Sequence, residues 1–168
     1  MLLTFENIVL VIAGTLTGLS AGVYYTFNVA VMPALRAIRG KQHIAMMQAV
    51  NIKIQNPVFF LSFFGPTVLL PLAAWQNRDL AEFPLLVAAA LLHIVGVNGV
   101  TVVGNIPIND KLEKINTDHL SEEEADQIRE EFHGTASAWM RLHNIRTITA
   151  TLATALVLIA CLSKSMSR

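Results

Sequence analysis

The sequence predicts an all-α fold, a four-helix transmembrane bundle with an amphipathic interfacial helix and a helical cytoplasmic loop. Of the 168 residues, 54% are hydrophobic and only 14% are charged, whereas soluble domains carry roughly 25% charged residues. The charge is also segregated, because six of the twelve acidic residues lie between Glu122 and Glu131. The remaining stretches are long and apolar, and the length indicates a single integral membrane domain over residues 1–168.

Four apolar runs are long enough to cross a bilayer, which takes about 20 residues per helix. They cover approximately residues 5–35, 57–75, 83–103 and 145–162. The first run has no basic residue before it and is longer than the core of a signal peptide, so we expect a retained spanning helix. It also carries Gly14, Gly18 and Gly22 at every fourth position, a stripe that favours close packing against another helix of the same chain. Pro66 lies within the second run and predicts a kink there.

The two long connections are predicted to contain helices of their own. The first covers residues 36–56, and four apolar residues recur in it at helical spacing: Ile44, Met47, Val50 and Ile54. This pattern predicts an amphipathic helix that lies on the membrane face. In the second connection, Ser121 followed by three glutamates is typical of a helix start. We expect this helix to present a solvated acidic face and to run into the fourth apolar run, with a break near Gly134.

Lysine and arginine counts predict how the chain is oriented in the membrane. Nine of the twelve basic residues lie in or beside the two long connections, and three lie on the opposite side. Because cytoplasmic loops carry the excess of lysine and arginine, we expect the long loops in the cytoplasm and both termini outside. The net charge is zero and there is no basic patch with interleaved aromatic residues, so no nucleic-acid partner is predicted. The single Cys161 excludes an intramolecular disulfide.

Polar residues gather where the third apolar run ends and the fourth begins. Three of them share one helix face through their spacing of four and then three positions: Trp139, His143 and Arg146. Asn105 and Asn109 follow the third run, and Pro107 between them is expected to interrupt the helix and place Asn109 on a turn. Asn28 in the first run and Asn51 in the first connection are expected to reach the same depth. The sequence therefore predicts a polar site at one membrane face.

The residue types in this site suit an aromatic ligand that carries or develops negative charge on an oxygen. An asparagine amide holds a carbonyl or phenol without adding charge, an arginine stabilises an oxyanion or enolate, and a tryptophan offers a flat stacking face. The cationic form of His143 is expected to be disfavoured beside Arg146, which leaves a neutral imidazole able to take a proton.

Structural interpretations stay open for each of these residues. Trp139 suits an interfacial anchor, Arg146 a side chain that reaches the headgroups, Asn105 a helix cap, and His143 a hydrogen-bonded interfacial residue. Their joint position favours a site, because polar groups inside membrane segments are costly and usually face a cavity.

The other histidines are not assigned to this site. His93 lies deep in the third run, where we expect a hydrogen bond to a neighbouring helix, with a haem or copper ligand as the alternative. His43, His119 and His133 lie in polar segments and are expected to be solvated. No HxxxH, HExxH or CxxC spacing is present, so no metal site built by the protein is predicted.

Short pieces of sequence, in order along nearly the whole chain, resemble the anthrone oxygenase-like family of small membrane proteins, long catalogued as a domain of unknown function. The matching pieces are Gly18-x-x-x-Gly22-x-Tyr24, Val31-Met32-Pro33-Ala34-Leu35, Met47-Gln48-x-x-Asn51, Asn56-Pro57, Asn105-x-Pro107-x-Asn109 and Trp139-x-x-x-His143-x-x-Arg146. The resemblance implies a four-helix membrane bundle. It also implies oxidation of anthrones to anthraquinones, with dioxygen as co-substrate and no evident cofactor.

These observations together predict an integral membrane oxygenase-like protein that acts on a small apolar aromatic substrate, anthrone- or quinone-like, at one membrane face. His143 and Arg146 are the predicted catalytic residues. The predicted substrate-binding residues are Asn28, Asn51, Asn105, Asn109 and Trp139. The alternative is a non-enzymatic membrane binding or accessory protein for a lipid, a quinone, haem or a partner subunit, and a transporter is a third interpretation. A homo-oligomer in the lipid bilayer is compatible with the sequence.

Overall fold

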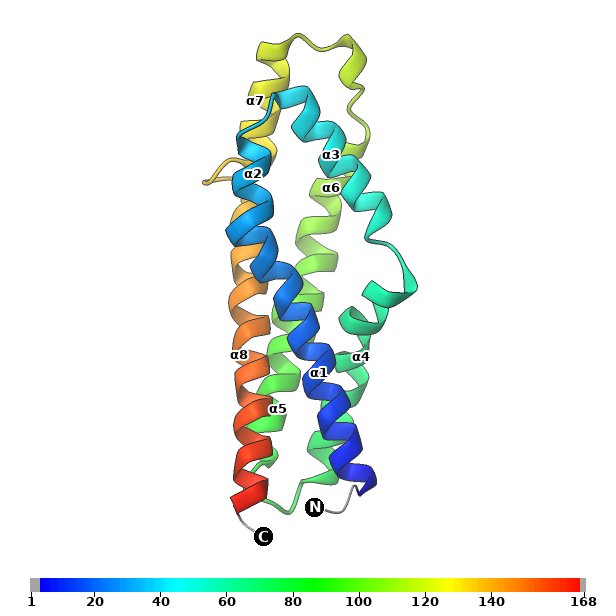
Figure 1. Ribbon diagram of the computed structural model, residues 1–168, viewed down its shortest axis with the longest axis vertical. Helices are drawn as coiled ribbons and strands as arrows, with labels where there is room; N and C mark the ends of the chain where they lie inside the picture. Colours follow the sequence, from blue (N-terminus) through cyan, green and yellow to red (C-terminus); the bar gives the residue numbers. More distant parts are fainter. Residues whose placement is uncertain (1–3, 167–168) are drawn as a thin grey trace.

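The computed structural model describes residues 4–166, and all regular structure in that range is helical. Four helical columns form the body of the molecule (Figure 1). The first is α1 (Phe5–Thr26), η1 (Phe27–Val31) and α2 (Met32–Arg36), and the second is α4 (Pro57–Gln76). The third is α5 (Phe83–Leu91), η2 (Leu92–Gly99), η3 (Thr101–Asn105) and α6 (Ile106–Glu113), and the fourth is α7 (Glu122–His133) and α8 (Ala138–Met166). Each column contains a stretch long and apolar enough to cross a membrane, which confirms the predicted fold class.

Side-chain caps set the points at which several of these helices begin. Asn56 accepts a hydrogen bond from the backbone N–H of Phe59 at 3.0 Å, directly before Pro57 opens α4. Ser121 begins a helix as expected and forms a capping box, because its hydroxyl accepts from the backbone N–H of Glu124 and the Glu124 carboxylate accepts from the backbone N–H of Ser121. The break expected near Gly134 is also present, since α7 ends at His133 and α8 begins at Ala138.

Three π-helical segments, η1, η2 and η3, interrupt the first and third columns. They explain why the expected interruption at Pro107 is wrong. The backbone N–H of Ile106 bonds to the carbonyl of Thr101, five residues earlier, so the turn before Pro107 is already widened. Pro107 then occupies the first turn of α6, where its missing N–H costs little, and the helix continues to Glu113. Asn109 therefore lies on a helix and not on a turn.

Small residues allow close packing in the half of the bundle that contains both ends of the chain. Alanines without solvent exposure, such as Ala13, Ala73 and Ala153, join α1, α4 and α8 in one apolar cluster. The glycine stripe of α1 takes part as predicted at two positions, because a Cβ at Gly14 or Gly18 would lie 3.1 Å or 3.7 Å from side chains of α8. α4 continues as one helix through Pro66, and the kink expected there stays a prediction.

The opposite end of the molecule is built by α3 (Gly40–Lys53), α6 and α7 (Figure 1). The apolar stripe of α3 packs against the protein, since Ile44 and Met47 are buried in a cluster with Leu112 of α6 and Trp139 of α8. Helix α3 also approaches the backbone of α7 closely, because a Cβ at Gly40 would collide with it. Helix α3 thus covers this end of the bundle and brings its polar residues to the third and fourth columns.

The expectation that His43 and His133 are solvated is wrong. They are 0% and 1% exposed, because α3 and the end of α7 fold over each other and enclose both rings. The glutamates on the outer face of α7 are exposed, as predicted, and so is His119 in η4 (Thr117–His119).

The start of α1 and the end of α8 lie at one end of the molecule, and the two long connections lie at the other (Figure 1). This arrangement agrees with the predicted separation of termini from long loops. Which of the two ends faces the cytoplasm stays a prediction from the charge counts.

Candidate functional site

A cavity of about 580 Å³ lies where α3, η3 and α6 meet the starts of α4 and α8. Its wall is mostly apolar, and five phenylalanines contribute to it: Phe27, Phe59, Phe60, Phe63 and Phe64. Phe60 and Phe64 on α4, and Val102 and Ile106 on the third column, line the cavity and are also exposed at the surface. Exposed apolar side chains therefore border the cavity on both α4 and the η3–α6 segment.

The cavity brings together most of the residues that the sequence singled out. Five of the seven predicted site residues line it: Asn51, Asn109, Trp139, His143 and Arg146. The other two support the site from behind. Asn28 donates a hydrogen bond to the hydroxyl of Thr147 at 2.8 Å, and the buried Asn105 donates to the backbone carbonyl of Trp139 at 3.3 Å.

Trp139, His143 and Arg146 form one stacked unit at the start of α8. The indole and imidazole rings lie parallel, with centroids 4.9 Å apart and an interplanar angle of 8°. The guanidinium Nη2 of Arg146 donates to Nδ1 of His143 at 3.0 Å, and Nη1 donates to the hydroxyl of Thr101 at 3.2 Å. The indole N–H donates to Oδ1 of Asn109 at 2.8 Å, which ties the unit to α6.

Hydrogen bonds define the tautomer of His143. A guanidinium can only donate, so Nδ1 of His143 accepts from Arg146 and carries no proton. The proton of the neutral ring is then on Nε2, which donates to the backbone carbonyl of Tyr24 at 3.2 Å. Both ring nitrogens are therefore engaged, and Nδ1 can accept a proton only after the Arg146 guanidinium has moved away.

Arg146 is a buried cation without a carboxylate partner. Its residue is 7% exposed, and no acidic side chain among the described residues forms an ion pair with it. Its guanidinium carbon instead lies 4.9 Å from the ring centroid of Tyr24 and 5.8 Å from that of Trp139. A buried charge is costly unless it is paired, so this positive charge favours an anionic or electron-rich ligand.

Two buried N–H groups at the cavity have no hydrogen-bond partner among the described residues. One is the Nε–H of Arg146, and the other is the Nδ2 amide group of Asn51. Buried polar groups are normally satisfied, so unused donors in a cavity indicate a ligand that presents oxygen acceptors. The arrangement therefore suits a flat apolar molecule with a carbonyl or phenolate oxygen at its inner end.

The sequence analysis did not assign several residues that complete this site. Tyr24 and Thr101 contact Arg146, and Asp110 and Glu113 lie at the rim on α6. The only available signal for Tyr24 was its place in a family-like motif. The phenylalanines of α4 were visible as an apolar run, which does not distinguish a cavity wall from a lipid-facing surface.

His93 makes the expected hydrogen bond to a neighbouring helix. Its Nε2 lies 3.0 Å from the backbone carbonyl of Phe63 on α4, and Asn98 donates to the same carbonyl at 3.2 Å. Both side chains point toward α4 and do not line the cavity. Among the described residues, no group of three or more His, Cys, Asp or Glu side chains is arranged to hold a metal ion.

Comparison with known proteins identifies one related family. A family model described as anthrone oxygenase matches residues 56–156, which extend from the cap of α4 through most of α8. The match includes both the Asn105–Asn109 segment and the Trp139–Arg146 unit. No curated protein and no solved structure matches the chain.

Proposed function

The chain belongs to the anthrone oxygenase family, and on that premise we propose that it is a membrane oxygenase that oxidises a small aromatic substrate, anthrone- or quinone-like. The observation that carries this proposal is the buried, carboxylate-free guanidinium of Arg146 at an aromatic-walled cavity. The cavity volume of about 580 Å³ is within the roughly 300–1,000 Å³ typical of small-molecule sites.

A lateral opening between α4 and the η3–α6 segment would admit a substrate that arrives from the membrane. An apolar polycyclic molecule partitions into lipid, and the exposed cavity-lining residues of α4 and η3 provide an apolar path for it. Inside, Trp139 offers a stacking face and the phenylalanines of α4 enclose the rings. The substrate oxygen then accepts hydrogen bonds from the unused N–H groups of Arg146 and Asn51.

The proposed chemistry begins with proton removal from the acidic ring carbon of the substrate. As the substrate oxygen gains negative charge, the Arg146 guanidinium turns toward it and releases Nδ1 of His143, which takes the proton. The hydrogen bond from Nε2–H to Tyr24 keeps the imidazole oriented during this exchange. The enolate reacts with dioxygen and takes the proton back from His143 to form a ring hydroperoxide. The hydroperoxide loses water to give the ketone, so one anthrone and one dioxygen yield one anthraquinone and one water.

The test uses the full chain in lipid nanodiscs with an anthrone as substrate. Oxygen consumption and anthraquinone absorbance are measured against the rate without protein. Arg146→Gln should lower the protein-dependent rate by about 10²–10³-fold, the cost of removing a main oxyanion donor. Arg146→Lys should recover only part of it, because an ammonium cannot reproduce the planar fork. His143→Ala should also lose turnover.

Arg141→Gln is the matched control, since Arg141 lies on the same helix but is exposed. It should keep the parent rate. An Arg146→Gln protein that is folded and still turns over at the parent rate would contradict the proposed role of the guanidinium.

A second candidate function is non-enzymatic binding of a quinone, lipid or haem. It is favoured by one observation, namely that both nitrogens of His143 are already hydrogen-bonded. If this function is correct, the purified protein should contain a bound chromophore or bind a quinone saturably. It should consume no oxygen with any anthrone. Absorbance spectra of the purified protein, recorded before and after addition of an anthrone, separate the two functions.

A further inference from the structure

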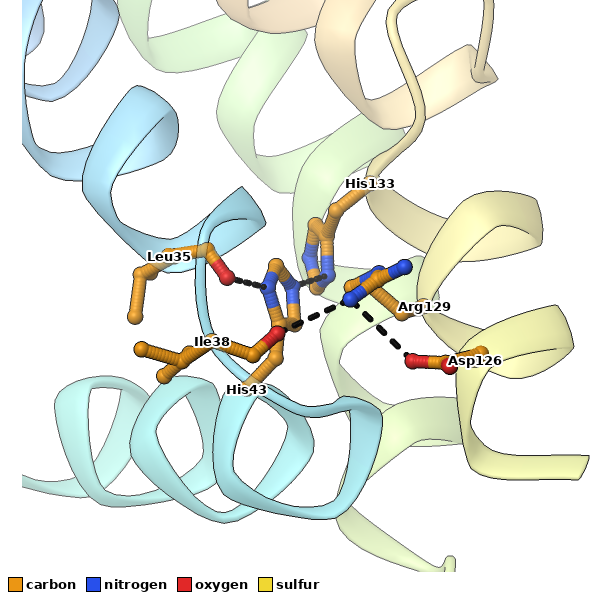
Figure 2. Close-up of polar contacts among 6 residues, drawn as sticks. All are labelled: Leu35, Ile38, His43, Asp126, Arg129 and His133. Carbon is orange, nitrogen blue, oxygen red and sulfur yellow. Dashed lines mark hydrogen bonds and ion pairs between the residues drawn. The ribbon is translucent and has the colours of Figure 1, made fainter. Parts of the chain in front are cut away.

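A second polar cluster lies behind the cavity, at the contact between α3 and the end of α7. Figure 2 shows the ring of His43 pointing toward that of His133, with their Nε2 and Nδ1 atoms 3.0 Å apart. The other nitrogen of His43, Nδ1, lies 3.0 Å from the backbone carbonyl of Leu35. Neither ring lines the cavity, so the pair has no direct contact with a ligand there.

The hydrogen bonds show which ring nitrogens of this pair carry a proton. A carbonyl can only accept, so Nδ1–H of His43 donates to Leu35. Nε2 of the neutral His43 ring is then the acceptor for Nδ1–H of His133. Burial lowers the pKa of His43. The hydrogen bond to Leu35 raises this pKa, and the charges of Arg129 and Arg36 lower it. The pKa is lowered on balance, which supports a neutral His43 ring.

The surroundings of the pair are unsuited to a bound cation. Arg36 donates to the backbone carbonyl of His133 at 3.3 Å, and Arg129 donates to the carbonyl of Ile38 at 2.9 Å. The one carboxylate drawn beside them, that of Asp126, forms an ion pair with Arg129 at 3.1 Å (Figure 2). Two guanidinium groups beside the rings repel a metal ion, so a structural role of the pair is favoured.

The orientation of the His133 ring depends on a single hydrogen bond. Its Nε2 has no partner among the described residues, so only the bond from Nδ1–H to His43 distinguishes one ring orientation from the flipped one. The same ring packs perpendicular to the indole of Trp139, with centroids 4.9 Å apart. Trp139 in turn stacks on His143 and lines the cavity.

We propose that His43 is a positioning residue for the cavity: its hydrogen bond fixes the ring of His133, and that ring holds the indole of Trp139 against the cavity. A residue of α3 thereby controls the stacking face without touching the ligand. The effect of His43 on turnover rests on the proposed function, whereas its effect on Trp139 does not.

Two substitutions at position 43 separate positioning from general stability. An asparagine amide nitrogen takes the place of Nδ1, so His43→Asn keeps the donor to Leu35 and removes the acceptor for His133. A glutamine amide oxygen takes the place of Nε2, so His43→Gln does the reverse. Each variant loses one of the two hydrogen bonds, and only His43→Asn loses the bond that the proposal requires.

The readout is the fluorescence of Trp139 in a Trp75→Phe background, because the chain has two tryptophans. The full chain in nanodiscs at pH 7.5 is titrated with acrylamide, and the emission maximum and anisotropy are recorded. His43→Asn should raise the quenching constant, shift the emission to longer wavelength and lower the anisotropy. His43→Gln and the exposed-site control His119→Asn should match the parent. Equal changes in both position-43 variants, or no change in His43→Asn, would overturn the proposal.

His133→Phe provides an independent check if His43→Asn does not fold. The phenyl ring keeps the packing volume but cannot donate to His43, so the same change in Trp139 fluorescence is expected. Where all variants fold, His43→Asn combined with His133→Phe should give no more change than either alone, because both remove one interaction. Additive changes would show that the two histidines act separately and would contradict the proposal.

Turnover of an anthrone supplies a second, distinguishable readout. Loss of an ordered stacking face should raise the KM of His43→Asn by about two- to twelvefold, the range expected for one aromatic contact. His43→Gln should keep the parent KM. If no variant, including the parent, oxidises an anthrone, the proposed function fails, and the fluorescence result still decides the positioning role.

Discussion

At the scale of single residues, Arg146 and His143 differ in whether their polar groups are free to meet a ligand. Arg146 brings an uncompensated charge and an unused N–H group to the cavity, so it is ready for a ligand oxygen. His143 has no free nitrogen until Arg146 moves. The spacing of the two residues predicted that they share a helix face, but it could not predict that one occupies the proton-accepting nitrogen of the other.

His43 gives a residue-scale prediction about pH. Its folded pKa is lowered from the ordinary value of 6.5, so below pH 6.5 the unfolded chain binds more protons at this position than the folded chain does. The free energy of unfolding should therefore fall as the pH decreases below about 6.5, by at most about 1.4 kcal/mol per pH unit for one group. Denaturant unfolding in detergent from pH 7.5 to 5 measures this slope.

His43→Gln removes the titrating ring and should flatten the slope. The same slope in His43→Gln and the parent would show that other groups produce the acid sensitivity.

At the scale of helices, two glycines give a matched test of packing. A Cβ at Gly40 would collide with the backbone of α7, whereas a Cβ at Gly22 meets nothing within 4 Å. Gly40→Ala should lower the thermal midpoint by forcing α3 away from α7. Gly22→Ala should keep or raise it, because alanine is favoured over glycine in a helix by about 1 kcal/mol. Circular dichroism melts check both, and equal midpoints would exclude the predicted close approach.

Helix starts and helix interruptions differ in how well the sequence predicts them. Ser121 and Glu124 satisfy each other within one turn, so the helix start at Ser121 is a local property and was predicted correctly. The π-helical turns before Pro107 were not predicted, because no local sequence pattern indicates a hydrogen bond from a backbone N–H to the carbonyl five residues earlier. As a result the third column is longer than expected, and Asn109 is placed where it can accept from the indole of Trp139.

At the scale of the whole molecule, the distribution of charge predicts which end faces the cytoplasm. The basic residues predict that the long connections are inside and the turn after α4 is outside. In a Cys161→Ser background, Asp79→Cys should therefore react with a membrane-impermeant maleimide in intact cells. Glu123→Cys should react only after the membrane is permeabilised. Both positions are exposed, so the reverse pattern would mean that the orientation is inverted.

The sequence by itself determined the helical membrane bundle, the helix start at Ser121 and the shared face of Trp139, His143 and Arg146. These features follow from hydropathy, capping and helical periodicity, which act over a few turns of one segment. Tertiary structure alone decided that α3 closes the cavity and that His43 meets His133, since these two residues are 90 positions apart. Contacts of that kind arise from how helices pack against one another, and neither segment carries a local pattern that specifies its distant neighbour.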